Sequence, residues 1–193
     1  MIEDKDSIRR RYKQKRADLG PEQRSVLSAQ LTEQAMAFLA ARDQVRHVHL
    51  FLPIARLHEV DTSLLVARLF QCGRTLYTSV TDFSAKEMQT VALLPGIAWE
   101  EDEMGIPVPA ALQWVEQEDK IDLVLLPLLA FDLEGVRVGY GMGYYDQFLS
   151  RLPAGVWKVG LSYFPPEERL PRENHDVPMD ACILPNEILY FNR

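Results

Sequence analysis

Apolar residues recur at helical spacing in several segments of the chain. Gly20 and Pro21 mark the start of one such segment, because proline is favoured at the first position of a helix. The spacing predicts helices over residues 4–18, 20–42, 60–73 and about 143–152.

Short apolar, β-branched runs separate these helices and predict strands. The run over 120–132 is the longest and is typical of a strand buried on both faces. The others cover residues 45–54, 74–80, 87–93, 156–164 and 181–185. Strands that alternate with helices favour an α/β fold, here a mostly parallel open sheet flanked by helices in a Rossmann-like three-layer sandwich. Residues 100–119 are acidic and contain proline, and we interpret them as a loop with a short helix.

Length and composition indicate an ordinary globular protein. The 193 residues are 47% hydrophobic and show no internal repeat or linker, so residues 1–193 are predicted to form a single domain. No apolar run reaches the ~18 residues that span a bilayer, and the N-terminus is too charged for a signal peptide. We therefore expect a cytoplasmic monomer without a membrane partner. Cys72 and Cys182 lie far apart in apolar segments, which predicts reduced, buried thiols.

Charge is distributed unevenly along the chain. Residues 1–24 carry eight Lys/Arg and five Asp/Glu, a net +3, so a total of −7 leaves −10 for the remainder. A general nucleic-acid binder rarely has this balance, so we expect no nucleic-acid partner. Six basic residues fall within positions 9–16, and a helix would bring Lys5, Arg9 and Arg16 near one another. This stretch is either a solvated helix face or an anion site; an RNA-binding helix is the alternative that salt-dependent binding would reveal.

Three of the ten glycines fall within five residues, in the segment GYGMGYYDQFL over 139–149. Backbone amides at a helix N-terminus can hold a phosphate, and residues without side chains allow close approach. The segment fits neither the dinucleotide fingerprint, which has glycine where Tyr144 stands, nor the P-loop, which needs Gly-Lys-Ser/Thr. An anion-binding loop, a tight turn and close strand–helix packing all remain open on these residues.

The wider segment LLPLLAFDLEGVRVGYGMGYYDQFL, over 125–149, resembles the signature of the 5-formyltetrahydrofolate cyclo-ligase family. Four further segments resemble family motifs in the same order along the chain. They are the basic first helix with Lys5 and Arg9, HEVDT (58–62), GIPVP (105–109) and HDVPMDACI (175–183). Departures occur at Met142, Gln147 and Ser79, where the family usually has other residues.

The resemblance implies an ATP-dependent ring closure of 5-formyltetrahydrofolate to 5,10-methenyltetrahydrofolate, with Mg²⁺ as the metal. It implies catalytic roles for Arg137, Tyr144 and Asp146, and metal ligation by Asp146 and Asp180. The implied ATP-binding residues are Lys5, Arg9, Arg137, Gly139, Gly141, Met142, Gly143, Tyr144 and Tyr145. The implied folate-binding residues are Glu59, Tyr140, Gly141, Met142, Gly143 and Tyr144.

Each of these roles has a simpler alternative. Asp146 can complement the helix dipole, Asp180 can be a solvated loop residue, and Glu59 can be a surface acid before a helix. His58 and His175 are interpreted as flanking residues, and no catalytic role is expected for His47 or His49. A catalytically silent protein that binds nucleotide or folate is the alternative to an enzyme.

Overall fold

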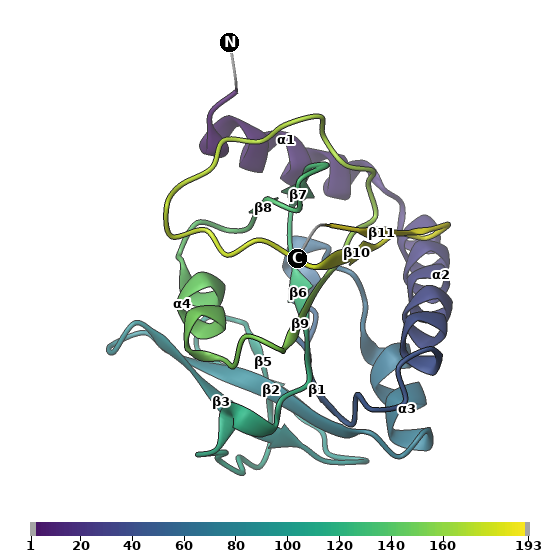
Figure 1. Cartoon of the computed structure of the whole chain (residues 1–193), viewed down its shortest axis with the longest axis vertical. Helices are drawn as coiled ribbons and strands as arrows, with labels where there is room; N and C mark the ends of the chain where they lie inside the picture. Colours follow the sequence, from purple (N-terminus) through teal and green to yellow (C-terminus); the bar gives the residue numbers. More distant parts are fainter. Residues whose placement is uncertain (1–2, 192–193) are drawn as a thin grey trace.

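Two helices open the chain, as their apolar spacing predicts. The computed structural model describes residues 3–191 (Figure 1). Helix α1 (Lys5–Asp18) begins where the carboxylate of Asp4 accepts a hydrogen bond from the Ser7 amide, which satisfies one free donor of the first turn. Helix α2 (Pro21–Ala40) begins at Pro21 after a Gly20 cap. Both predicted helices are confirmed to within two residues.

Seven strands form one mixed sheet in the order β11-β10-β9-β6-β1-β2-β3. The five inner strands are parallel, and β3 and β11 pair antiparallel at the two edges. The strands are β1 (His47–His49), β2 (Thr75–Asp82), β3 (Glu87–Leu93), β6 (Leu123–Pro127), β9 (Trp157–Leu161), β10 (Ala181–Ile183) and β11 (Ile188–Tyr190). This confirms the mostly parallel α/β sheet.

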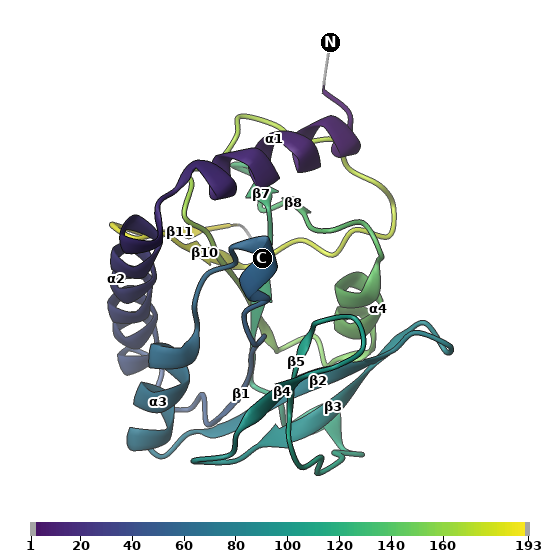
Figure 2. The same cartoon turned by 180° about the vertical axis from the view of Figure 1, so that it is seen from behind.

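Helices cover both faces of this sheet. Phe38 of α2 and Leu69 of α3 (Ser63–Gln71) pack in one apolar cluster, and Phe148 of α4 (Tyr144–Arg151) packs in another. Successive side chains of β6 enter the two clusters alternately, which explains why this strand is apolar at consecutive positions. Figures 1 and 2 show α2 and α3 together on one side of the molecule and α4 on the other, so the three-layer arrangement is confirmed.

The apolar run over 120–132 is not one strand, contrary to the prediction. It begins in the 3₁₀ helix η2 (Glu118–Lys120), forms β6, and continues into β7 (Ala130–Phe131), which pairs with β8 (Arg137–Val138) in a separate hairpin. Pro127 ends β6, since proline has no N–H to continue the ladder. Helix α1 packs on this hairpin through Ile8 and Tyr12.

Two other predictions are wrong in part. The run over 45–54 forms strand only at β1; Phe51 and Leu52 are buried beyond it, before Pro53 and the 3₁₀ helix η1 (Ala55–Leu57). Within residues 100–119, a hairpin of β4 (Trp99–Glu101) and β5 (Pro107–Pro109) precedes η2. Most of the apolar residues of the 45–54 run are buried, as their character predicts. Burial alone does not make a strand, because a strand also needs a neighbouring strand with which its backbone can pair.

The cysteines also differ from each other. Cys182 in β10 is buried and burial raises its pKa, whereas Cys72, at the end of α3, is exposed. The prediction of a buried thiol is therefore wrong for Cys72. Within residues 3–191, no helix has both the length and the apolar composition needed to cross a membrane.

Candidate functional site

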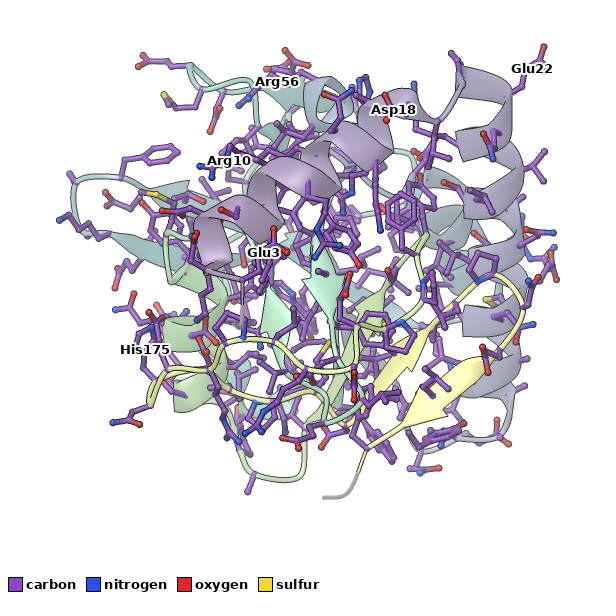
Figure 3. All side chains as sticks on the ribbon, turned by 90° about the horizontal axis from the view of Figure 1, so that it is seen from above. Glu3, Arg10, Asp18, Glu22, Arg56 and His175 are labelled. Carbon is purple, nitrogen blue, oxygen red and sulfur yellow. The ribbon has the colours of Figure 1, made fainter. Side chains whose placement is uncertain are left out.

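A cavity of about 570 Å³ opens beyond the carboxyl ends of β1 and β6, where ligands of parallel α/β sheets bind. Phe51 and Leu52, which follow β1, and Pro127, which ends β6, form part of its wall. The rest of the wall comes from α1, residues 54–59, the β2–β3 hairpin, the β5 and β8 segments, the glycine segment, the start of α4 and residues 173–176. Viewed from above, Arg56 and His175 of this wall lie on opposite sides of α1 (Figure 3).

The cavity collects nearly every residue that the sequence pointed to. Only Asp180 of the predicted site residues is missing from its wall. Those that line it are Lys5, Arg9, Glu59, Arg137, Gly139, Tyr140, Gly141, Met142, Gly143, Tyr144, Tyr145 and Asp146. Segments far apart in the sequence therefore meet in one place.

The glycine segment is a loop in which two glycines have left-handed backbone conformations. Gly141 has φ +97°, and Gly143, which precedes the first turn of α4, has φ +73°. These conformations favour glycine. A Cβ at Gly141 would also lie 2.8 Å from Cζ of Arg9, whose Nε donates to the carbonyl of Gly139 at 3.0 Å. The glycines thus allow both a tight turn and close approach of a guanidinium.

The buried Arg137 and the partly exposed Asp146 form an ion pair beside this loop. A guanidinium nitrogen of Arg137 lies 2.7 Å from Oδ1 of Asp146, and the same oxygen accepts the Val177 amide at 3.0 Å. Arg137 also donates to the Val177 carbonyl. Burial lowers the pKa of Arg137, whereas the Asp146 carboxylate acts in the opposite direction. The pair fixes the first turn of α4 against the 172–180 segment, so Asp146 does more than complement a helix dipole.

Glu59 lies at the end of a hydrogen-bond chain that begins in α1. Arg16 donates to the hydroxyl of Tyr140 at 2.8 Å, and Tyr140 donates to Oε1 of Glu59 at 2.6 Å. Oε2 of Glu59 accepts the Ile54 amide at 2.8 Å. The side chain is buried, which excludes the surface-acid alternative. Burial raises the pKa of Glu59, although the donors Tyr140 and Ile54 counteract this shift.

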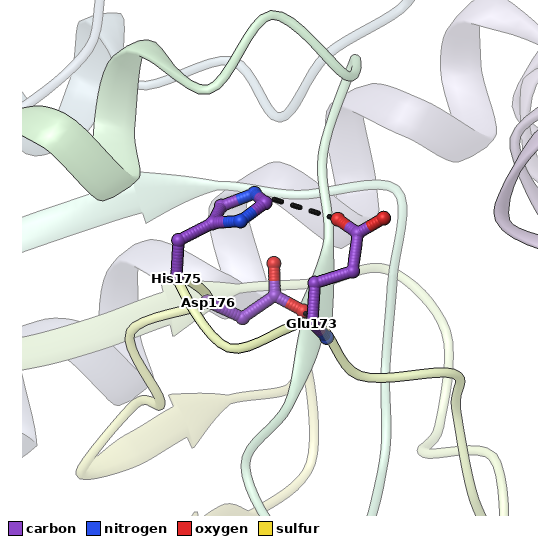
Figure 4. Close-up of side chains that lie close together, drawn as sticks. All are labelled: Glu173, His175 and Asp176. Atoms are coloured by element: carbon purple, nitrogen blue, oxygen red, sulfur yellow. Dashed lines mark hydrogen bonds and ion pairs between the residues drawn. The ribbon is translucent and has the colours of Figure 1, made fainter.

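Sequence reasoning missed a polar cluster at the mouth of the cavity, made by Glu173, His175 and Asp176 (Figure 4). His175 Nε2 lies 3.4 Å from Glu173, and the Lys5 ammonium lies 2.8 Å from both Glu173 and Asp176. Burial opposes the charge of Lys5, but the two carboxylates outweigh it and raise its pKa. The mixed Glu, His and Asp residues within four positions were the available signal. His175, interpreted from the sequence as a flanking residue, lines the cavity.

Asp180 lies outside the wall of the cavity, unlike the other predicted metal ligand. Its buried Oδ2 accepts the backbone amide of Lys158 at 2.8 Å and lies 3.2 Å from the Lys158 ammonium. These contacts join the start of β10 to β9. Asp180 therefore connects two strands of the sheet. The nearby acid that does line the cavity is Asp176.

Two other residues of the glycine-containing signature hold its backbone in place. The buried Asp132 accepts hydrogen bonds from the amides of Glu134, Val136 and Leu170. Gly135 has φ +80°, and a Cβ there would come within 2.9 Å of the Met179 carbonyl. Much of the signature thus shapes the hairpin that presents Arg137.

The basic stretch of α1 does not form a continuous cationic face. Arg16 is buried, Arg9 contacts the glycine loop, and Arg11 forms ion pairs with Glu3 and Glu167. Basic residues on different sides of the helix thus serve different partners inside the protein.

The chain is similar to known proteins over most of its length. The profile of the family described as "5-formyltetrahydrofolate cyclo-ligase family" matches residues 1–185. A 5-formyltetrahydrofolate cyclo-ligase of Haemophilus influenzae is 28% identical over 179 residues, which cover 91% of this chain and 94% of that protein. A mitochondrial one from Arabidopsis thaliana is 30% identical over 72% of this chain and 59% of that protein. The solved structure of Aquifex aeolicus 5,10-methenyltetrahydrofolate synthetase superimposes with a TM-score of 0.81 at 29% identity, covering 98% of this chain and 93% of that one.

Proposed function

Because this chain belongs to the 5-formyltetrahydrofolate cyclo-ligase family, we propose that its cavity binds ATP and 5-formyltetrahydrofolate and closes the folate ring to 5,10-methenyltetrahydrofolate. The observation that carries the proposal is the meeting of a glycine loop, two arginines and a buried glutamate around one cavity. A catalytically silent binder would need the same cavity but has no observation in its favour.

The triphosphate belongs at the glycine loop and the first turn of α4. Backbone amides at a helix N-terminus can bind a negatively charged ligand, and Lys5, Arg9 and Arg137 line the cavity around this turn as cations. The Lys5 ammonium already donates hydrogen bonds to Glu173 and Asp176. Its three donors would therefore be shared between these carboxylates and a phosphate. Tyr144 and Tyr145, at the start of α4, also line the cavity.

The folate belongs nearer to Glu59 and Tyr140. A carboxylate offers about four lone-pair sites, and Glu59 uses one on each oxygen, so it can accept further hydrogen bonds from ring N–H groups. Phe51, Leu52 and Ile106 supply apolar contacts, and Met142 is 69% exposed at the rim, where it can cover a flat ring.

The reaction has two steps in this proposal. The formyl oxygen attacks the γ-phosphorus and ADP leaves; N10 then attacks the formyl carbon, and phosphate leaves with the N10 proton as the ring closes. The chain contributes positioning and charge neutralisation, which are its main tasks in phosphoryl transfer. Arg137 lies beside the loop that receives the charge, and Asp146 holds it there.

The donor set fits Mg²⁺. This ion prefers one or two carboxylates together with phosphate oxygens, and it neutralises charge on the phosphates when bound. Asp146 lines the cavity and uses Oδ1 for its hydrogen bonds with Arg137 and Val177. Within residues 3–191, Oδ2 of Asp146 has no such partner, so it is the oxygen that remains to bind the ion. Asp176 and Glu173 are further oxygen donors at the mouth.

The test is direct. Purified protein is incubated with ATP, Mg²⁺ and 5-formyltetrahydrofolate while the absorbance of the methenyl product is followed. Product that requires both ATP and a divalent metal supports the proposal. Binding of both ligands without turnover would favour the silent binder, and full turnover in EDTA would refute the metal assignment.

A further inference from the structure

A buried histidine contacts the cavity wall from behind. His49 in β1 is 0% exposed and lies against the Phe148 ring of α4, with 4.7 Å between ring centroids. Its Nε2 is 2.7 Å from the hydroxyl oxygen of Ser79 in β2. Nδ1 has no hydrogen-bond partner among the described residues. A fully buried ring is therefore tied to the protein through one nitrogen only.

Ser79 also lines the cavity. The residue is partly exposed. Within residues 3–191, His49 is the one hydrogen-bond partner of its hydroxyl. A hydroxyl has one donor and two acceptor positions, so the position of the His49 proton decides what Ser79 presents to a ligand.

The unpartnered Nδ1 indicates which nitrogen carries the proton. Burial lowers the pKa of His49 to about 3; Glu118 raises this pKa slightly and Arg151 lowers it slightly. The ring is therefore neutral and carries one proton. Buried N–H groups without a partner are rarer in proteins than buried acceptors that lack one. A proton on Nδ1 would create such an orphan donor. A proton on Nε2 instead pairs with Ser79 and leaves a bare acceptor at Nδ1.

We propose that Ser79 is a specificity residue that donates a hydrogen bond to the bound ligand, because His49 fills its acceptor side through Nε2–H. The hydroxyl proton then has no other partner within residues 3–191 and faces the cavity. His49 acts through Ser79, as a positioning residue.

The surrounding wall limits the chemistry of the ligand atom. The β2–β3 hairpin contributes Thr78, Ser79, Thr81, Phe83 and Met88 to the cavity, and none of these five is charged. The cations line other segments. Ser79 therefore fits a neutral acceptor, such as a carbonyl or hydroxyl oxygen or a ring nitrogen. Identification of this atom as part of the folate or of the nucleoside rests on the proposed function, and both ligands offer such atoms.

The tautomer is tested first, in the free protein. Nuclear magnetic resonance of isotope-labelled histidine distinguishes a protonated from a bare ring nitrogen without any turnover. We expect His49 to carry its proton on Nε2 at neutral pH. A proton on Nδ1 would overturn the proposal, because Ser79 would then give its own proton to Nε2.

The ligand contact is tested by calorimetry with 5-formyltetrahydrofolate and, separately, with a non-hydrolysable ATP analogue. Ser79→Ala should weaken one of the two ligands about 3- to 10-fold, the effect of one neutral hydrogen bond, and leave the other unchanged. Ser79→Thr, which keeps the hydroxyl, should restore that affinity. His49→Phe keeps a ring against Phe148 and should weaken the same ligand, but less. The matched control is Ser150→Ala on the exposed side of α4, which should change neither affinity.

Unchanged affinity for both ligands in a folded Ser79→Ala protein would overturn the proposal. Equal losses for both, not rescued by threonine, would also overturn it and indicate a general disturbance of the wall. If the wild-type protein binds ATP but forms no methenyl product, the proposed function fails instead. The tautomer and the ATP measurements then still decide the role of Ser79.

Discussion

Tyr140 donates its hydroxyl proton to Glu59 across 2.6 Å, although 81 positions separate the two residues in the chain. This bond connects the glycine loop to the segment that follows β1. The Arg16 guanidinium holds the same hydroxyl from α1, so three distant segments share one hydrogen-bond chain. Such a chain fixes the orientation of the Glu59 carboxylate before a ligand arrives, which lowers the ordering cost of binding.

Glu59→Gln should impair folate binding much more than ATP binding. Removing one charge-assisted hydrogen bond costs about 1.5–3 kcal/mol, which is roughly a 10- to 150-fold loss of folate affinity. Its thermal stability should fall, since the amide NH2 replaces one of two oxygens that accept hydrogen bonds from Tyr140 and Ile54. Calorimetry with each ligand and a melting curve measure both effects. Equal losses for the two ligands would contradict the assignment of Glu59 to folate.

Folate affinity should also fall on mild acidification. Burial raises the pKa of Glu59 above its ordinary value of 4.5, so the carboxylate takes up a proton at a higher pH in the folded protein. A raised carboxyl pKa means that protonation favours the folded state, and stability gained from Glu59 increases as pH falls through that folded value. Folate affinity, which needs the ionised form, should decrease over the same range. The pH profile of the Glu59→Gln protein should be flatter; an unchanged profile would exclude Glu59 as its cause.

Arg9→Ala should weaken apparent ATP affinity by roughly 10- to 150-fold, because it removes a charged contact with phosphate worth ~1.5–3 kcal/mol. Arg10→Ala is the matched control; Arg10 is exposed and bonds only its helix neighbour Ser7 within residues 3–191, so the change should stay within ~0.5 kcal/mol. Competition binding with an ATP analogue gives both values. Similar losses at the two positions would indicate a diffuse electrostatic surface.

Arg11→Ala should separate stability from ATP binding. Arg11 forms ion pairs with Glu3 and Glu167. Both pairs are partly exposed, so we expect a loss of up to about 1 kcal/mol in the free energy of unfolding and no change in ATP affinity. Denaturant unfolding and ligand titration check the two parts. Weaker ATP binding in a fully folded Arg11→Ala protein would show that the triphosphate site extends along α1.

Gly141→Ala should damage the site more than Gly143→Ala. Both positions have positive φ, so each substitution strains the backbone, but only a Cβ at Gly141 meets a neighbour, at 2.8 Å from Cζ of Arg9. The alanine at Gly141 therefore displaces Arg9 as well, and ATP affinity should fall further. Titrations of the two proteins decide the order. Equal affinities would show that Arg9 adjusts without cost.

We expect Asp146→Asn to change the metal dependence of turnover and Asp180→Asn to change thermal stability. The first should raise the Mg²⁺ concentration needed for half-maximal turnover, since it removes the carboxylate in the cavity. The second should lower the melting temperature with no change in metal dependence, because the buried Asp180 pairs with Lys158. Metal titrations of turnover, with melting curves for both proteins, give the answer. A shifted metal requirement in Asp180→Asn would restore Asp180 as a ligand.

Local spacing predicted most of the fold because burial and helix ends leave periodic marks in a sequence. Helices α1 and α2 and strand β3 begin within one residue of their predicted starts, at Lys5, Pro21 and Glu87. The divided strand at 120–132 was missed because apolar side chains mark burial, whereas a strand also needs a neighbour with free backbone groups.

The sequence by itself determined the fold class, the family and the part of the cavity wall around the glycine loop, because that loop and its flanking residues lie within one short segment. Only the tertiary structure decided which charges face that cavity. Asp176 lines it and Asp180 does not, although the two are only four positions apart, and His49 in β1 reaches Ser79 in the neighbouring strand β2. Side-chain partners of this kind depend on strand register and on the packing of distant segments, which local periodicity does not encode.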